Sequence, residues 1–91
     1  MNEAMKIKLE MEASDGEEWA RIYERKLKPF FDRKRQDLFS FFIDESSAKQ
    51  ENLLLLKLQC NSLTSLENEF IDIIETGRLA RQQLNEENRN E

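Results

Sequence analysis

The stretch that decides the fold runs from residue 63 to residue 84 and reads LTSLENEFIDIIETGRLARQQL. Its apolar and small residues alternate spacings of three and four, which is the heptad pattern of a helix packed against another helix. The seam positions are Leu63, Leu66, Phe70, Ile73, Gly77, Ala80 and Leu84. The pattern extends back through Gln59 to Leu56. We therefore predict a long helix over residues 47–84, followed by a polar, disordered tail over residues 85–91.

Gly77 is the unusual member of this seam. Glycine inside a helix costs about 1 kcal/mol relative to alanine, so another interaction should offset that cost. We expect Gly77 and Ala80 to form a notch of small residues that lets a second helix approach closely. The alternative is a helix that frays or stops near Thr76.

A second run of apolar residues at helical spacing precedes the seam, from Trp19 to Phe42. Ser14 or Asp15 can cap this helix, because a glutamate follows each of them by three residues. Pro29 interrupts the run, and an interior proline removes one backbone hydrogen bond. We predict a first helix over residues 15–43 that is kinked at Pro29.

The first thirteen residues are ambiguous. Met5, Ile7, Leu9 and Met11 alternate with charged residues, as in a half-buried strand. Their residue types favour a helix instead, and a lone strand lacks a pairing partner. We expect residues 1–13 to form a short helix or arm that docks on the rest of the chain.

The best candidate for a chain reversal is the run Asp44, Glu45, Ser46 and Ser47, since these residues cap helices well or form their interiors poorly. Ser47 with Gln50 makes a second capping box. The rival is one continuous helix from about residue 30 to residue 85, which would expose its seam unless it oligomerised.

The hairpin is the preferred interpretation, and it has consequences for packing. An antiparallel pair would place Trp19 near Phe70 and Ile73, and Phe31 beside Cys60. A chain of 91 residues with only two glycines and one proline has few turns and one small core. We therefore predict a single all-α domain over residues 1–91.

The apolar stripe of the second helix is wider than one partner helix needs. Leu58, Ile71 and Ile74 are the predicted surplus face. A homodimer that forms a four-helix bundle would bury this face, so a dimer is the expected oligomer.

Residues 21–35 form a basic segment inside a chain whose net charge is −5. We expect its bases to pair with acids such as Glu67 and Glu69. The alternative is that two copies of the segment in a dimer bind nucleic acid, against which the acidic balance argues. The seven bases are Arg21, Arg25, Lys26, Lys28, Arg33, Lys34 and Arg35.

The residues required by most catalytic chemistry are missing from this sequence. It has no histidine and one cysteine, Cys60, which excludes a histidine-assisted nucleophile, a Cys/His zinc site and a disulfide framework. The acid series Glu69, Asp72 and Glu75 lacks converging ligands from other helices. We therefore predict no catalytic residues, no metal and no cofactor, with Cys60 as a buried apolar residue.

The expected function is non-enzymatic: a helical module for oligomerisation and protein–protein interaction in an adaptor, regulatory or structural role, with a protein partner of unknown identity. A small nucleic-acid-binding regulator is the alternative. The chain begins without a secretory signal pattern, and no apolar run is long enough to cross a membrane. We expect a cytoplasmic protein with no membrane partner, in agreement with a lone thiol.

Overall fold

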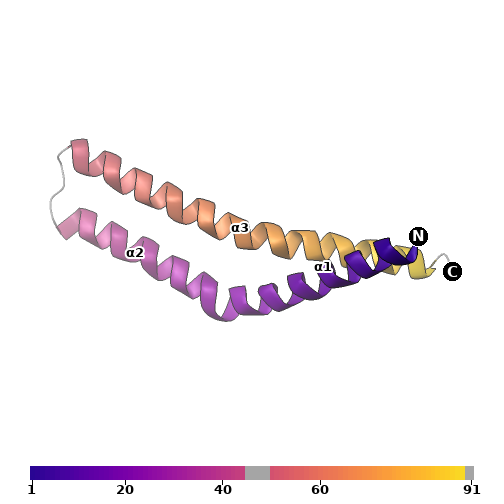
Figure 1. Cartoon of the computed structure of the whole chain (residues 1–91). Helices are drawn as coiled ribbons and strands as arrows, with labels where there is room; N and C mark the ends of the chain where they lie inside the picture. The colour runs from indigo at the N-terminus through magenta and orange to yellow at the C-terminus, as the bar shows by residue number, and fades with distance from the viewer. Residues whose placement is uncertain (45–49, 90–91) are drawn as a thin grey trace.

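The computed structural model describes residues 1–44 and 50–89 as an antiparallel helical hairpin (Figure 1). One arm consists of α1 (Glu3–Ile22), a π-helical segment (Tyr23–Leu27) and α2 (Lys28–Asp44). The other arm is the single long helix α3 (Gln50–Arg89), and the two chain ends lie at the same end of the molecule. The predicted all-α hairpin is thus confirmed, and the described residues contain no strand.

The first arm begins earlier than the sequence indicates. The Asn2 side chain accepts a hydrogen bond from the Met5 amide at 2.7 Å and caps α1, which then runs through Ser14 and Asp15 without a break. Residues 1–13 are therefore neither a strand nor a separate short helix. Leu9 and Ala13 are buried against α3, so packing favours one continuous helix over a new start at a second cap.

The kink predicted at Pro29 is present as a bend at the π-helical segment (Figure 1). The Lys28 amide donates to the Tyr23 carbonyl five residues back, which widens the turn just before the proline. Proline has no backbone N–H, and in a regular helix its ring collides with the carbonyl four residues earlier. The wider turn relieves that collision, so the chain bends and continues as helix.

The two glycines of the chain meet where α1 crosses α3. A Cβ atom on Gly16 would lie 2.6 Å from the Gly77 Cα, and one on Gly77 would lie 2.8 Å from the Glu12 carbonyl oxygen. Side chains larger than hydrogen cannot fit there. This close approach confirms the notch predicted at Gly77, and the helix does not stop at Thr76.

The last turns of α3 differ from the predicted tail. The helix extends to Arg89 rather than ending at Leu84, and Leu84 is buried with Leu9. The amino group of Met1 also forms an ion pair with Glu87 at 3.0 Å. The start of α1 therefore holds the end of α3 in place, which a reading of residues 85–91 in isolation could not reveal.

At the opposite end, the predicted reversal falls partly outside the described residues. α2 ends at Asp44 and α3 begins at Gln50, so the chain reverses between them. The run from Glu45 to Ser47 and its capping box with Gln50 cannot be compared with the structure, because residues 45–49 lie outside the described ranges.

The packing register is confirmed on one side of the bend and wrong on the other. The Trp19 and Phe70 rings lie 5.2 Å apart between centroids, as predicted. Phe31, however, packs on the same Phe70 ring at 6.3 Å instead of beside Cys60. Trp19 and Phe31 would be about 18 Å apart along a straight helix, so the bend brings them together.

Candidate interaction site

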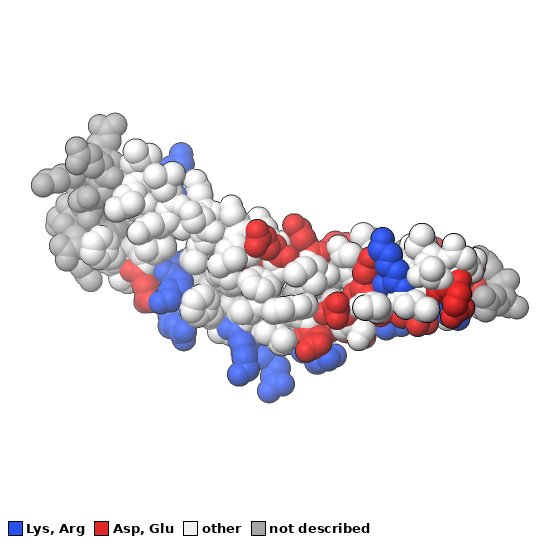
Figure 2. Space-filling model, viewed as in Figure 1, with Lys and Arg blue, Asp and Glu red and all other residues white. Residues whose placement is uncertain are grey.

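The buried apolar core lies mainly in the half of the hairpin that contains the chain ends. Its cluster consists of Leu9, Ala13, Ala80 and Leu84, and Phe31 is buried separately near the bend. We call the other half, residues 28–44 and 50–66, the distal half. Large apolar side chains are exposed there, namely Phe30, Phe39, Phe41, Ile43, Leu53, Leu54, Leu55, Leu58 and Leu66. Figure 2 shows an extensive uncharged surface over this end of α3.

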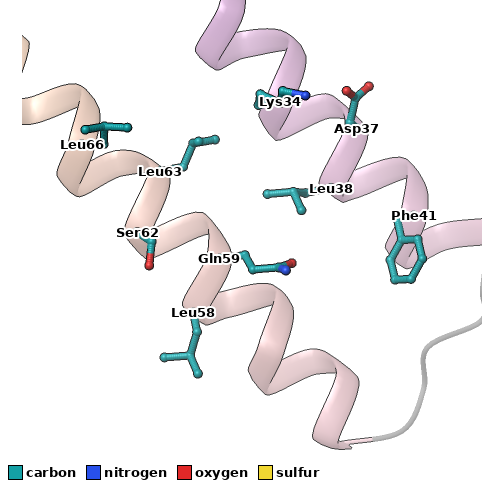
Figure 3. A pocket seen from close by; sticks show the side chains of 9 residues that line it. All are labelled: Lys34, Asp37, Leu38, Phe41, Leu58, Gln59, Ser62, Leu63 and Leu66. Carbon is teal, nitrogen blue, oxygen red and sulfur yellow. The ribbon is translucent and has the colours of Figure 1, made fainter.

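A groove of about 710 Å³ lies between α2 and α3 in the distal half, and we call it the distal groove (Figure 3). The lining residues of each helix recur at helical spacing, so each helix presents one face to the groove. Leu38 and Leu63 point toward one another across it. The groove is lined by Lys34, Asp37, Leu38 and Phe41 of α2 and by Leu58, Gln59, Ser62, Leu63 and Leu66 of α3.

Two opposite charges, Lys34 and Asp37, lie at the α2 edge of the distal groove (Figure 3). Both side chains are exposed. The Lys34 ammonium lies 5.7 Å from the centre of the Phe30 ring, within the range of a cation–π contact. None of the ion pairs among the described residues involves Lys34 or Asp37.

A buried polar cluster holds the bend against α3. The Glu67 carboxylate is 8% exposed and accepts hydrogen bonds from the Tyr23 hydroxyl at 3.0 Å and from the Arg35 guanidinium at 2.5 Å. The two donors are twelve positions apart, Tyr23 in the π-helical segment and Arg35 in α2. One carboxylate of α3 therefore fastens both α2 and the π-helical segment.

The electrostatics of this cluster favour an ionised Glu67. The hydrogen bond from Arg35 holds the pKa of the Glu67 carboxyl below its usual value, and the bond from Tyr23 acts in the same direction, against the effect of burial. Burial, and then the hydrogen bond to Glu67, raises the pKa of the Tyr23 hydroxyl. At neutral pH this cluster is a fixed ionic clamp rather than a source of protons.

The structure separates the members of the predicted basic segment. Arg35 pairs with Glu67, while Arg33 and Lys34 lie over the Phe30 ring. Glu69 is exposed and forms no ion pair within the described parts of the chain. The other four bases are exposed around the bend, and Figure 2 shows Lys and Arg side chains along its outer margin.

The three residues of the predicted oligomer face do not share one face. Leu58 lines the distal groove, Ile71 is exposed, and Ile74 is half-buried beside Gly77. A helix turns about 100° per residue, so Leu58 and Ile71 lie roughly 140° apart around the axis of α3. The sequence predicted that α3 carries more apolar residues than one partner helix can cover. It did not show that these residues lie on different sides of the helix.

The α2 side of the distal groove was missed at the sequence level. Leu38 and Phe41 belong to the run of apolar residues from Trp19 to Phe42, which was assigned to the first helix without a binding surface. The signal that could have located the groove is the polar run from Asp32 to Asp37, which offers no apolar side chain to α3 for more than one turn. Over this run the contact between the two helices is the Arg35–Glu67 ion pair rather than apolar packing.

Features that would support other chemistry are not found in the described residues. They contain no group of three potential metal-ligating side chains, and Cys60 is a half-buried thiol. None of the helices within residues 1–44 and 50–89 is long and apolar enough to cross a membrane. Comparison with protein-family models, with curated protein sequences and with solved structures finds no match for this chain.

Proposed function

We propose that this chain is a non-enzymatic association module that forms a homodimer, with its distal half buried in a four-helix arrangement, and thereby serves an adaptor, regulatory or structural role. The observation that carries the proposal is the set of exposed apolar side chains around the distal groove. Phe41, Leu58 and Leu66 are exposed and line the groove, and apolar side chains gathered in this way mark interaction sites because their exposure to water is unfavourable.

The exposed area of the single chain supports the proposal. The chain exposes 7161 Å², whereas a compact monomer of 10.9 kDa exposes roughly 5,600 Å². The difference, on the order of 1,600 Å² for one chain, is about twice the 800 Å² that each partner contributes to a typical specific interface, so the surplus is large enough to supply one. The radius of gyration is 19.3 Å, against about 12 Å for a compact chain of this length.

Sedimentation equilibrium at micromolar concentration tests association directly. We expect a mass of twice 10.9 kDa for the unmodified chain. Leu58→Glu should weaken the dimer at least about tenfold, because it places a charge in an apolar interface. Leu79→Glu is the matched control, since Leu79 lies on the same helix with a similar exposed fraction, 51% against 54%, outside the distal half.

A monomeric mass for the unmodified chain would reject the proposal. Equal weakening by the two leucine substitutions would show that the distal half is not the interface. Far-UV circular dichroism of each variant separates a loss of association from a loss of folding.

The exposed bases around the bend support a second candidate function, binding to nucleic acid. Phosphate contacts release counterions, so such binding should weaken steeply between about 50 and 200 mM salt. Arg25→Glu combined with Lys26→Glu removes two of these bases without altering the distal groove or the clamp at Glu67. Submicromolar binding at physiological salt that this double variant abolishes would favour the nucleic-acid function over the association module.

A further inference from the structure

Four exposed side chains of α2 form one stripe, which we call the α2 stripe: Phe30, Lys34, Asp37 and Phe41. Their spacings of four, three and four place them within an arc of about 60° around the helix axis. Phe30 is 38% exposed and Phe41 is 60% exposed. Three of the four also line the distal groove, so the stripe and the groove form a continuous surface.

The chemical order of the α2 stripe is palindromic. From either end it runs aromatic, charged, charged, aromatic, and the two central charges have opposite signs. A two-fold interface uses the same patch on both subunits, so that patch must be complementary to itself. An antiparallel copy of α2 satisfies this condition, because each cation then faces an anion and each aromatic ring faces another.

We propose that the second copy docks with its α2 antiparallel to the first α2, about a two-fold axis that passes between residues 35 and 36. Lys34 of each copy then pairs with Asp37 of the other, and Phe30 packs against Phe41. This inference rests on the proposed homodimer and specifies its interface. A polyanionic or strongly basic occupant fits less well, because the stripe carries one charge of each sign.

The arrangement has a consequence for the shape of the dimer. The hairpin is 63 Å long, and the axis crosses it near the reversal, roughly 15 Å from that end. The two halves that contain the chain ends then project in opposite directions. The dimer is roughly 95 Å long, whereas two hairpins aligned along their full length would stay near 63 Å.

Charge reversal at the two central positions tests the pairing. Lys34→Glu places two acids opposite two acids in the homodimer, and Asp37→Lys places two bases opposite two bases. Each variant alone should dimerise at least about tenfold more weakly than the unmodified chain. An equimolar mixture of the two should form a heterodimer with an affinity within about threefold of the original, because every charge again faces its opposite.

The matched controls are Lys26→Glu and Asp72→Lys, which make the same charge changes at exposed positions away from the stripe. They should leave the dimer unchanged and show no preference for each other in a mixture. Sedimentation velocity with one chain fluorescently labelled measures each of these equilibria, and small-angle X-ray scattering of the unmodified dimer gives its maximum dimension.

The outcomes separate this inference from the proposed function. A stable dimer whose affinity neither reversal changes, or whose length stays near 63 Å, would overturn the α2 interface and leave the association module standing. A monomeric unmodified chain would overturn both and assign the distal groove to a different occupant. Heterodimer formation by the mixture cannot come from a pair within one chain, so it would support the two-fold interface.

Discussion

At the scale of single residues, Glu67 is the side chain on which the bend depends most. Its carboxylate accepts from Tyr23 and Arg35, and losing its charge leaves the Arg35 guanidinium with only the longer, exposed ion pair to Asp32 at 3.6 Å. Glu67→Gln should lower the free energy of unfolding by about 2 kcal/mol at pH 7. Urea unfolding measures this, with Glu69→Gln as a control of the same chemistry at an exposed position.

The stabilisation that Glu67 provides should change with pH in a definite direction. The folded state holds the pKa of Glu67 below the ordinary value of 4.5, so the stabilisation is fully present above that value. It is lost as the pH falls through the lower pKa of the folded state. The stability difference between the unmodified chain and Glu67→Gln should therefore shrink in acid. A difference that grew below pH 4 would contradict the clamp.

At the scale of helices, the crossing of α1 and α3 depends on two opposed glycines. Glycine to alanine normally stabilises a helix by up to about 1 kcal/mol. Here the added methyl group meets the backbone of the other helix, so Gly16→Ala should instead lower the free energy of unfolding by about 2 kcal/mol. Chemical denaturation checks this, with Ser65→Ala as an exposed control. A more stable Gly16→Ala protein would show that the helices do not approach so closely.

Features of the helices that arise from local chemistry could be predicted from the sequence. The bend at Pro29 follows from a missing backbone N–H, and the need for a close neighbour at Gly77 follows from the cost of a glycine inside a helix. The partner of Phe31 could not be predicted. The prediction assumed that both arms are straight, so that each residue of the first arm faces α3 at a position fixed by counting from the reversal. The bent arm takes a longer path than α3, which shifts every contact beyond the π-helical segment.

The start of α1 also depends on contacts between distant parts of the chain, which the sequence does not reveal. Asn2, Ser14 and Asp15 are all competent caps, so the sequence alone does not choose among them. Burial of Leu9 and Ala13 against the end of α3 decides in favour of Asn2, and that contact joins residues more than seventy positions apart. The candidate site was partly predicted for a similar reason: Leu58 was expected on an exposed face, but its neighbours from α2 depend on the register.

At the scale of the whole molecule, the two halves of the hairpin differ in how many of their apolar side chains they bury. The half with the chain ends has a small buried core, a glycine crossing and ion pairs between the arms at Met1–Glu87 and Glu17–Arg81. Among the described residues, the distal half buries only Phe31 of its apolar side chains and leaves nine large ones exposed, against seven in the longer remainder of the hairpin. This asymmetry is the physical basis for assigning association to the distal half.

Thiol protection measures most directly whether a second copy covers the distal groove. In a Cys60→Ala background, Gln59→Cys places a thiol in the groove without removing a residue of the α2 stripe, and Met11→Cys places one at a position that is 63% exposed on the other half. If a second copy covers the groove, the thiol at position 59 reacts slowly with a thiol-specific reagent at concentrations where the dimer forms and rapidly on dilution, while the thiol at position 11 reacts rapidly throughout. Equal, concentration-independent reaction at both positions would contradict this coverage.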